Sequence, residues 1–266
     1  MTLEKQIAAA LSRLRGSAPL IHCITNYVTA GDTANMLLAA GASPIMADSP
    51  SESAEITALA DGLTLNLGTP SESRIEAMLR SGAEANKRGI PVVFDPVGAG
   101  CSQLRRNACL EIIREVKPAA VRGNLSELSW LAGFPAAERG VDTAETGISP
   151  GNAAEAAARR LSRVCAVTGE RDYISDGSRT IVIKNGTVLL RRITGAGCMT
   201  SALCAAMISV SDPFTGTAAG IAFMDICGEI AAERAAGLGA FRTGLFDAAG
   251  GITPELLAER LVIDEC

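Results

Sequence analysis

The chain has 266 residues, of which 48% are hydrophobic and 3% aromatic, and its mean hydropathy is +0.25. The formal net charge is −5 and there is no basic run, which excludes nucleic acid as the main partner because nucleic-acid binding needs a basic face. The core must come mainly from Ala, Leu, Ile and Val, and this favours a parallel sheet with helices on both faces. The length suits a single large α/β domain over residues 1–266.

The cysteine pattern and the apolar regions point away from secretion and from membranes. The eight cysteines are scattered without a C-x-x-C pair, so we expect reduced thiols in a cytoplasmic protein. Residues 1–16 form a charged amphipathic pattern that predicts a helix, not a signal peptide. The most apolar region, 199–224, is interrupted by Asp212 and Pro213. Each half is shorter than the ~20 apolar residues of a membrane span, so we expect two buried helices and no membrane partner.

Short β-branched runs alternate with helical periods along the first part of the chain. The pattern predicts strands over 19–24, 43–46 and 63–68. Between and after these strands it predicts three helices: one over 33–41, one from Glu52 onward and one over 72–88. Gly41 is the expected C-terminal cap of the first.

The second part of the chain continues the alternation. Further strands are predicted over 91–96, 119–124 and 164–169, and residues from Cys198 onward are predicted to be mostly helical. Residues 179–190 alternate around an Asn-Gly pair, which predicts a β-hairpin. Strand–helix alternation implies a right-handed, mostly parallel sheet, whose ligands bind beyond the carboxyl ends of the strands. Polar residues follow the predicted strands there, for example at Asn66 and Asp95.

The segment "ITGAGC" (193–198) resembles an anion-binding turn. Glycines before a helix let backbone N–H groups converge on an anion at the positive end of the helix dipole. Neither a G-x-x-x-x-G-K-[ST] motif nor a G-x-G-x-x-G motif is present, which excludes a Walker-type loop and leaves a Rossmann dinucleotide site unsupported. None of the four lysines lies in a glycine-rich segment. A phosphate bound at 194–198 would therefore depend on backbone N–H groups and magnesium.

Two carboxylates are candidates for that magnesium. Asp95 ends a buried strand in "VVFDPVGAG", where an unpaired carboxylate would be costly. Glu127 follows Asn124 by three residues in "RGNLSEL", which is also the pattern of a helix capping box, so both a structural and a functional role stay open. Mg²⁺ prefers such hard oxygen ligands together with phosphate oxygens. His22, the only histidine, is expected to pack inside a strand without a catalytic role.

Seven segments, taken in order, resemble the hydroxyethylthiazole kinase family of the ribokinase-like superfamily. They are "HCITNYVT", "GASPIMADSPSE", "LNLGT", "PVVFDPVGAG", "RGNLSEL", "AVTGERDYISDG" and "ITGAGC". The resemblance implies a three-layer α/β/α fold with a mostly parallel central sheet. It also implies transfer of the γ-phosphate of ATP to the hydroxyl of hydroxyethylthiazole, a step of thiamine salvage. Cys23 departs from the family pattern, in which asparagine commonly precedes "ITN".

The resemblance also implies roles for individual residues. Met46, Gly195 and Asn26 would bind the thiazole substrate; Arg122, Thr168 and Gly197 would bind ATP; Asp95 and Glu127 would hold Mg²⁺. The family forms homotrimers with active sites between subunits, so Asn26 and Met46 are expected to face the "TGAGC" loop of a neighbouring subunit.

Cys198 occupies the position at which many ribokinase-like enzymes carry an aspartate base. A free thiol has a pKa of ~8.5, and a helix N-terminus is expected to lower it, so Cys198 is a candidate base. A role in packing alone stays open. The alternatives to a thiazole kinase are a hydroxymethylpyrimidine kinase, a nucleotide-repair dehydratase, or a non-catalytic binder of thiamine precursors. The cysteine in "GAGC" weighs against the first two, and the set of Asp95, Glu127 and Cys198 weighs against the third.

Overall fold

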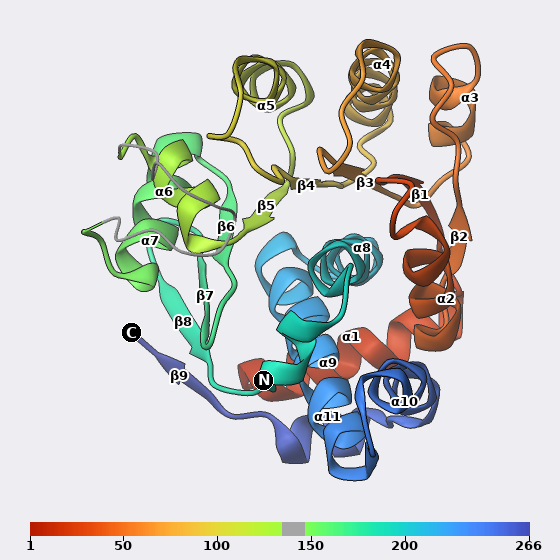
Figure 1. Cartoon of the computed structure of the whole chain (residues 1–266), viewed down its shortest axis with the longest axis vertical. Helices are drawn as coiled ribbons and strands as arrows, with labels where there is room; N and C mark the ends of the chain where they lie inside the picture. The colour runs from red at the N-terminus through yellow and green to blue at the C-terminus, as the bar shows by residue number, and fades with distance from the viewer. Residues whose placement is uncertain (135–146) are drawn as a thin grey trace.

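A single sheet organises the chain. In the computed structural model, which describes residues 1–134 and 147–266, nine strands pair in the order β2-β1-β3-β4-β5-β6-β7-β8-β9 (Figure 1). The strands are β1 (Leu20–Ile24), β2 (Ser43–Ile45), β3 (Gly62–Asn66), β4 (Val92–Asp95), β5 (Ala120–Gly123), β6 (Val164–Val167), β7 (Asp172–Ser175), β8 (Thr180–Ile183) and β9 (Ile263–Glu265).

The sheet has a parallel part and an antiparallel part. All pairs from β2 to β6 are parallel, and those from β6 to β9 are antiparallel. The parallel part confirms the expected mostly parallel sheet. Because parallel strands end at the same edge, Asn66 of β3 lies beside Asp95 of β4 in the register, and Arg122 of β5 lies beside Ala166 of β6.

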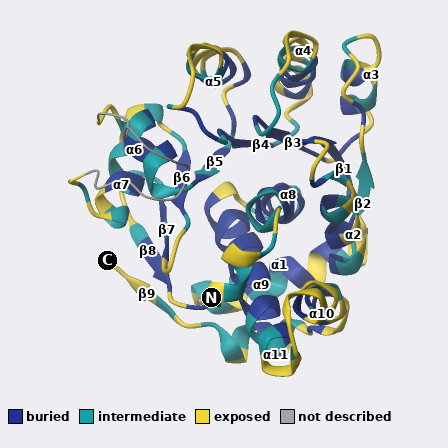
Figure 2. Cartoon of the chain, in the orientation of Figure 1, coloured by how far each residue is buried: buried dark blue, intermediate teal, exposed yellow. Residues whose placement is uncertain are grey.

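Among the residues that the structure describes, five helices cover one face of the sheet. Their apolar residues form one core with the strand residues that point to this face, among them Leu65, Phe94 and Val121. Figure 2 shows α4 and α5 exposed on the side away from the sheet, as expected for an amphipathic outer layer. The helices are α3 (Ser53–Thr57), α4 (Glu72–Arg88), α5 (Gln103–Val116), α6 (Leu125–Ala132) and α7 (Pro150–Leu161).

The other face is covered by a second helical layer with its own core. Two of its helices are buried almost all round, because small and apolar residues occupy every side of them. They pack closely: a Cβ on Gly220 would lie 2.6 Å from the backbone nitrogen of Cys204. The layer consists of α1 (Leu3–Ser17), α2 (Ala30–Ala40), α8 (Ala196–Ile208), α9 (Pro213–Arg234), α10 (Leu238–Gly251) and α11 (Pro254–Arg260). The three-layer α/β/α fold is thereby confirmed.

Local sequence signals define most of the helix ends. Ser71 accepts a hydrogen bond from the backbone N–H of Arg74 at the start of α4, and Asp212 does the same for Thr215 in α9. Gly41 ends α2 in the left-handed conformation, as predicted. The helix predicted over 72–88 has those boundaries, and the apolar region 199–224 forms two buried helices. Within the described residues, no helix combines the length and apolar character of a membrane span.

The hairpin predicted over 179–190 is wrong. Only Thr180–Ile183 forms a strand, and its free edge pairs with β9 from the end of the chain. Asn185 and Gly186 instead bind α9, since their side-chain and backbone N–H groups donate to the Glu229 carboxylate. The following residues form the 3-10 helix η1 (Val188–Arg192), which leads directly into the loop before α8. The chain does leave the strand at the Asn-Gly pair, but the pair contacts α9 and β8 pairs with β9, so the residues after the pair do not form a second strand.

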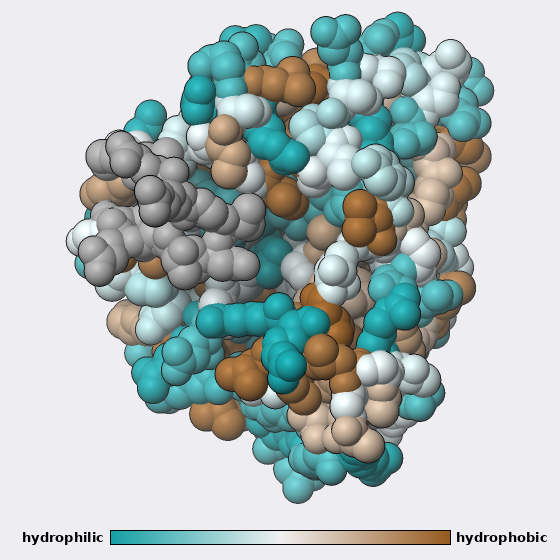
Figure 3. Space-filling view, in the orientation of Figure 1, coloured by the Kyte–Doolittle hydropathy of each residue, from teal (hydrophilic) through white to brown (hydrophobic). Residues whose placement is uncertain are grey.

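Exposed apolar side chains collect near the β2 edge of the sheet. Tyr27 and Val28 follow β1, Leu38 lies on α2, Met46 follows β2 and Leu59 follows α3. Tyr27 is 75% exposed and Leu59 is 71% exposed. Hydrophobic residues are visible along the margin of the molecule where α3 and β2 lie (Figure 3). Of these residues, Tyr27, Val28 and Met46 follow strands at their carboxyl ends.

Candidate active site

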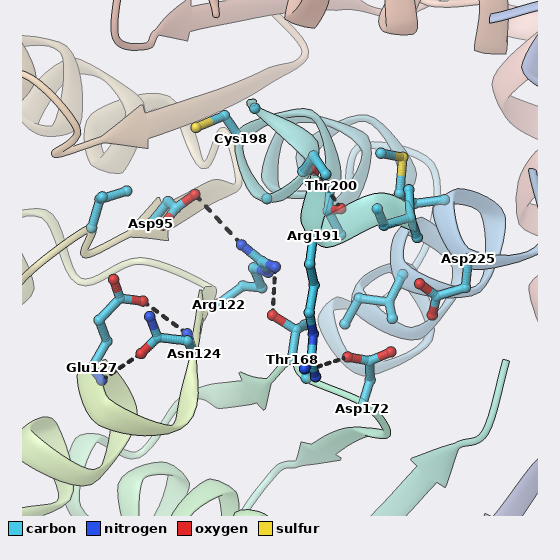
Figure 4. Close-up of a pocket in the computed structure, with 18 of the residues that line it drawn as sticks. Asp95, Arg122, Asn124, Glu127, Thr168, Asp172, Arg191, Cys198, Thr200 and Asp225 are labelled. Atoms are coloured by element: carbon cyan, nitrogen blue, oxygen red, sulfur yellow. Dashed lines mark hydrogen bonds and ion pairs between the residues drawn. The ribbon is translucent and has the colours of Figure 1, made fainter. Parts of the chain in front are cut away.

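A cavity of about 360 Å³ lies beyond the carboxyl ends of β4, β5 and β6. The N-terminus of α8 forms its opposite wall, so residues far apart in the sequence face one another across it (Figure 4). Seven sequence-predicted residues line this cavity: Asp95, Arg122, Glu127, Thr168, Gly195, Gly197 and Cys198. The prediction that polar residues at the strand ends meet at one place is confirmed.

Asp95 is a buried carboxylate with several partners. Its Oδ2 accepts hydrogen bonds from Asn66 Nδ2 at 2.9 Å and from Ser201 Oγ at 2.8 Å. The Arg122 guanidinium lies 3.8 Å from the same oxygen. Burial raises the pKa of the Asp95 carboxyl, whereas Arg122 and the two hydrogen-bond donors oppose that rise.

Glu127 has the structural role of a helix cap and also lines the cavity. Its Oε2 accepts from the backbone N–H of Asn124, and Asn124 Oδ1 accepts from the backbone N–H of Glu127, which completes a capping box at the start of α6. Its Oε1 accepts from the N–H of Gly98 at 2.8 Å and so ties the turn after β4 to α6. Burial and then the negative charge of Asp95 raise the pKa of Glu127 to about 7. The residue is therefore a cap that also lines the cavity.

Two arginines bring positive charge into the cavity. Arg122 donates from Nη2 to Thr168 Oγ1, and its buried Nε has no hydrogen-bond partner within the described residues. Arg191 of η1 extends across the cavity toward Asp172 (Figure 4). Both arginines line the cavity and can contribute to phosphate binding beside the backbone N–H groups, since arginine is a good bidentate partner of a phosphate.

The "TGAGC" turn is shaped by two glycines. Gly195 has a φ of 90° and precedes the first turn of α8; a Cβ there would lie 2.6 Å from Thr29 Cγ2. A Cβ on Gly197 would lie 2.7 Å from Arg122 Nη1. The first turn of α8 leaves its N–H groups without intrahelical partners, and these are available to an anion in the cavity.

Cys198 lies half-buried in this first turn and faces the strand ends. Its Sγ accepts from Asn26 Nδ2 at 3.0 Å and from Asn66 Nδ2 at 3.3 Å. Burial and then the charge of Asp95 raise the pKa of the thiol, although Thr29, Asn26 and Arg122 oppose that rise. The direction is opposite to the expected lowering, because desolvation and the neighbouring Asp95 carboxylate disfavour the thiolate.

Asn26 and Met46 lie outside the group of residues that line the cavity. Asn26 is buried, and its contact with Cys198 means that it reaches the "TGAGC" loop of its own chain and not, as expected, only that of a neighbour. Met46 is 38% exposed at the end of β2. His22 is buried, with Nδ1 2.8 Å from Thr57 Oγ1 and Nε2 2.8 Å from the Ala47 carbonyl oxygen, which confirms its packing role.

The far end of the cavity carries a second carboxyl pair that the sequence analysis does not single out. Asp172, at the start of β7, accepts from the Gly169 N–H at 2.8 Å. Asp225 of α9 lies close to Asp172, burial raises the pKa of both carboxyls, and the buried Oδ2 of Asp225 has no hydrogen-bond partner within the described residues. The signal that could have found Asp225 is a lone carboxylate inside an otherwise apolar helix, which is costly without a partner.

Asn66 and Ser201 are also missed. Ser201 lies three residues after Cys198 on α8, on the same side of the helix, yet its partner Asp95 is 106 positions away in the sequence. Asn66 ends a strand, and that position alone did not distinguish it from other polar strand ends. Only the approach of α8 to the strand ends brings these two residues onto Asp95.

Comparison with known proteins was made by sequence and by structure. The Hydroxyethylthiazole kinase family pattern matches residues 11–255. A hydroxyethylthiazole kinase from Clostridium beijerinckii is 43% identical over 268 residues, which covers 98% of this chain and 97% of the relative. Another from Ruminiclostridium cellulolyticum is 45% identical and covers 98% of each chain.

The structural comparison agrees. The structure of a hydroxyethylthiazole kinase protein from Pyrococcus horikoshii superposes with a TM-score of 0.90 at 37% identity, over 98% of each chain. A pyridoxal kinase from Staphylococcus aureus in complex with ADP has a TM-score of 0.66 at 14% identity, covers 93% of this chain and 98% of its own, and shares the fold alone. The ribokinase-like three-layer fold, the cavity at its strand ends and these matches lead to one conclusion: the chain belongs to the hydroxyethylthiazole kinase family.

Proposed function

We propose that this chain transfers the γ-phosphoryl group of ATP to the hydroxyl of hydroxyethylthiazole. The observation that carries the proposal is the cavity in which Asp95, Glu127, two arginines and the Cys198 thiol converge on the N-terminus of α8. In the reaction a bond forms between the alcohol oxygen and the γ-phosphorus, and the bond from that phosphorus to the β,γ-bridging oxygen breaks. The products are the thiazole phosphate and ADP, and the alcohol proton leaves to a base or to water.

Asp95 and Glu127 suit Mg²⁺ by the chemistry of their donor atoms. Both are buried hard-oxygen ligands, and the charge of Asp95 raises the pKa of Glu127, so a cation between them would relieve a repulsion that Arg122 only partly offsets. No group of three or more acidic, His or Cys ligands for a metal occurs within residues 1–134 and 147–266. That fits Mg²⁺, which commonly uses one or two carboxylates together with phosphate oxygens and waters. When bound, Mg²⁺ would neutralise charge on the transferring phosphate.

The remaining roles follow from position. The Nε of Arg122 has no partner within the described residues and the guanidinium contacts Thr168, which supports ATP-phosphate binding by both residues. Gly197 has no side chain, and this leaves space for the Arg122 guanidinium. Gly195 lines the cavity beside Cys198, and Asn26 holds the thiol, which supports substrate binding near both. Met46 is exposed at the β2 edge, where it can reach a thiazole only if the substrate extends beyond the cavity.

Cys198 is assigned as the base that accepts the alcohol proton. Its raised pKa keeps the thiol protonated at neutral pH, so the thiol must first release its own proton to water, and the resulting thiolate accepts the alcohol proton as the new bond forms. A loose transition state demands little early deprotonation, so a small thiolate population can serve. Cys198→Ala should lower kcat by ~10²–10⁴ with little change in ATP affinity. Cys198→Asp should keep activity, because a carboxylate with a reference pKa of ~3.9 is already ionised.

The control for that experiment is Cys204→Ala. Cys204 lies on the same helix, but its Sγ contacts the Thr217 carbonyl oxygen of α9 away from the cavity. Its loss should leave kcat within about threefold of the parent, as for a small core substitution. A Cys198→Ala enzyme as fast as the parent across pH would reduce Cys198 to a packing role.

Substrate identity is tested by a coupled assay of ADP release. Hydroxyethylthiazole should support turnover, and hydroxymethylpyrimidine and a blank should not. Preference for the pyrimidine would favour the pyrimidine kinase alternative, and binding of hydroxyethylthiazole without ADP release would favour a non-catalytic binder.

We also propose a single kinase domain over residues 1–266 that works as a homotrimer in the cytoplasm. One sheet runs from β1 to β9, which supports a single domain. All eight cysteines are free, which suits a reducing compartment. The exposed apolar residues of the β2 edge, including Tyr27 and Met46, support burial against another subunit and active sites shared between subunits. Sedimentation of an active monomer at working concentration would overturn the trimer.

A further inference from the structure

Asn66 is a buried polar residue at the last position of β3. It is 3% exposed, and in the sheet register it lies beside Asp95, the carboxylate at the end of β4. On its other side it meets the first turn of α8. The residue thus stands between the proposed magnesium ligand and the proposed base.

Four hydrogen bonds fix the orientation of the Asn66 amide. Its Oδ1 accepts from the backbone N–H of Gly68 at 2.9 Å and from Asn26 Nδ2 at 3.1 Å. A backbone N–H can only donate, so the oxygen must face Gly68 and the NH₂ group must face the other way. There, Nδ2 donates to Asp95 Oδ2 at 2.9 Å and to Cys198 Sγ at 3.3 Å.

The Cys198 sulfur therefore receives two amide donors. Asn26 Nδ2 lies 3.0 Å from Sγ and donates a second hydrogen bond to Asn66 Oδ1. The charged groups that face the thiol are Asp95 from β4 and Arg122 from β5. Hydrogen bonds to sulfur favour the thiolate over the thiol, so the two amides oppose the burial and the carboxylate charge that disfavour it.

The loss of Asn66 would affect the two neighbours unequally. Asp95 would keep Ser201 and Arg122 as partners. Cys198 would lose one of its two amide donors and, because Asn66 also anchors Asn26, part of the support of the other. The thiol would keep Asn26, its shorter donor at 3.0 Å, but would lose the one donor that also contacts Asp95.

We propose that Asn66 is the positioning residue of Cys198: its amide holds the thiol beside Asp95 and stabilises the thiolate when the sulfur gives up or exchanges its proton. The inference rests on the proposed function, in which Cys198 is the base. The single NH₂ group that contacts both atoms sets the separation between the base and the carboxylate.

The test is the pH dependence of Cys198 alkylation by iodoacetamide in the full chain, with each cysteine followed by peptide mass mapping. The midpoint should rise by about one pH unit in Asn66→Ala, as one lost hydrogen bond to a charged group implies. Greater access to the thiol would scale the rate at every pH without moving this midpoint. The exposed Cys101 serves as the internal reference and should not shift.

Two further variants complete the design. Asn66→Leu keeps the approximate size, adds no charge beside Asp95, removes the NH₂ group and should shift the midpoint upward even if Asn66→Ala folds poorly. Thr64→Val is the matched control, since Thr64 is buried two residues earlier on β3 and its Oγ1 has no partner within the described residues. It should leave the midpoint unchanged.

Turnover gives the second readout. In Asn66→Ala, kcat should fall about tenfold near neutral pH and recover at higher pH, whereas KM for ATP stays within about twofold. A midpoint unmoved in both Asn66 variants, or a rate deficit that is the same at every pH, would overturn the proposal. If the midpoint moves but Cys198→Ala retains the parent rate, the assignment of Cys198 as base fails and the positioning contact stands.

Discussion

The two ends of the cavity carry the same kind of residue in different arrangements. At the near end, Asp95 and Glu127 each have their own hydrogen-bond donors, from Asn66 and Ser201 in one case and from backbone N–H groups in the other. At the far end, Asp225 faces Asp172, whose charge raises the pKa of the Asp225 carboxyl.

Burial raises the pKa of all four carboxyls, but the consequences differ. The far pair can satisfy itself by sharing a proton, because each carboxyl is the partner of the other. The near pair is not bridged in this way and remains available to a cation. The two pairs of buried acids in this cavity are thus assigned different roles by what their oxygens already contact.

The largest effect is expected from the near pair. Asp95→Ala combined with Glu127→Ala should lower kcat by ~10³ or more. The proposed Mg²⁺ would lose both of its carboxylate ligands, and the charge of the transferring phosphate would no longer be neutralised. The matched control is Asp172→Asn combined with Asp225→Asn, which should keep kcat within about tenfold of the parent. Rates under saturating Mg²⁺ measure both. Near-normal turnover in the Asp95→Ala, Glu127→Ala double variant would contradict the assignment of the near pair to Mg²⁺.

The next effect concerns the turn between the two ends. A Cβ on Gly197 would displace the Arg122 guanidinium, so Gly197→Val should weaken ATP binding and lower kcat, each by at least about tenfold. Gly31→Val is the control, since Gly31 is likewise the second residue of its helix and has open space around it. Binding of ATP, measured by calorimetry, should separate them. Equal affinity in both variants would show that Arg122 does not depend on this glycine.

A smaller effect is expected in the pH dependence of stability. Glu127 has a pKa of about 7 in the fold against an ordinary value near 4.5, so the folded chain binds more protons between these two pH values. Its contribution to the free energy of unfolding is therefore fully present at low pH and is lost as pH rises toward 7. Glu127→Gln should flatten that decline, by on the order of 1–3 kcal/mol.

Denaturant unfolding at several pH values without Mg²⁺ measures this slope, which is insensitive to the constant cost of altering the capping box. The conservative control is Glu229→Gln. The Glu229 carboxylate accepts hydrogen bonds from Asn185 and Gly186 and does not line the cavity. A slope for Glu127→Gln as steep as that of the parent would contradict the assignment of the raised pKa.

The smallest effect is expected from Asp225→Asn alone. An asparagine can donate to Asp172 at every pH, so it replaces the shared proton by a permanent hydrogen bond. The free energy of unfolding at neutral pH should change by less than about 1 kcal/mol or rise, because a buried ionisable group has been removed. Thermal unfolding tests this. A large loss of stability would mean that the charge of Asp225, and not its hydrogen bond, is required at the far end.

The parallel half of the molecule could be predicted in detail from the sequence. Short apolar runs such as residues 91–96 are typical of strands inside a covered parallel sheet, and the residues that end such strands meet at one edge. Asp95, Arg122 and Thr168 are accordingly where the sequence predicted them. The antiparallel edge was less predictable, since β8 pairs with the distant β9 and not with the residues that follow it.

The sequence by itself determined the helices, the parallel strands and the residue types at their ends, because hydrophobic periodicity and capping act over a few residues. The tertiary structure alone decided the contacts of Asn66, Ser201 and Asp225, which join positions of α8 and α9 to strand ends far away in the chain. It also decided the direction of the Cys198 pKa shift. Ionisation and hydrogen bonding depend on every group that surrounds an atom, and a linear sequence records only the neighbours along the chain.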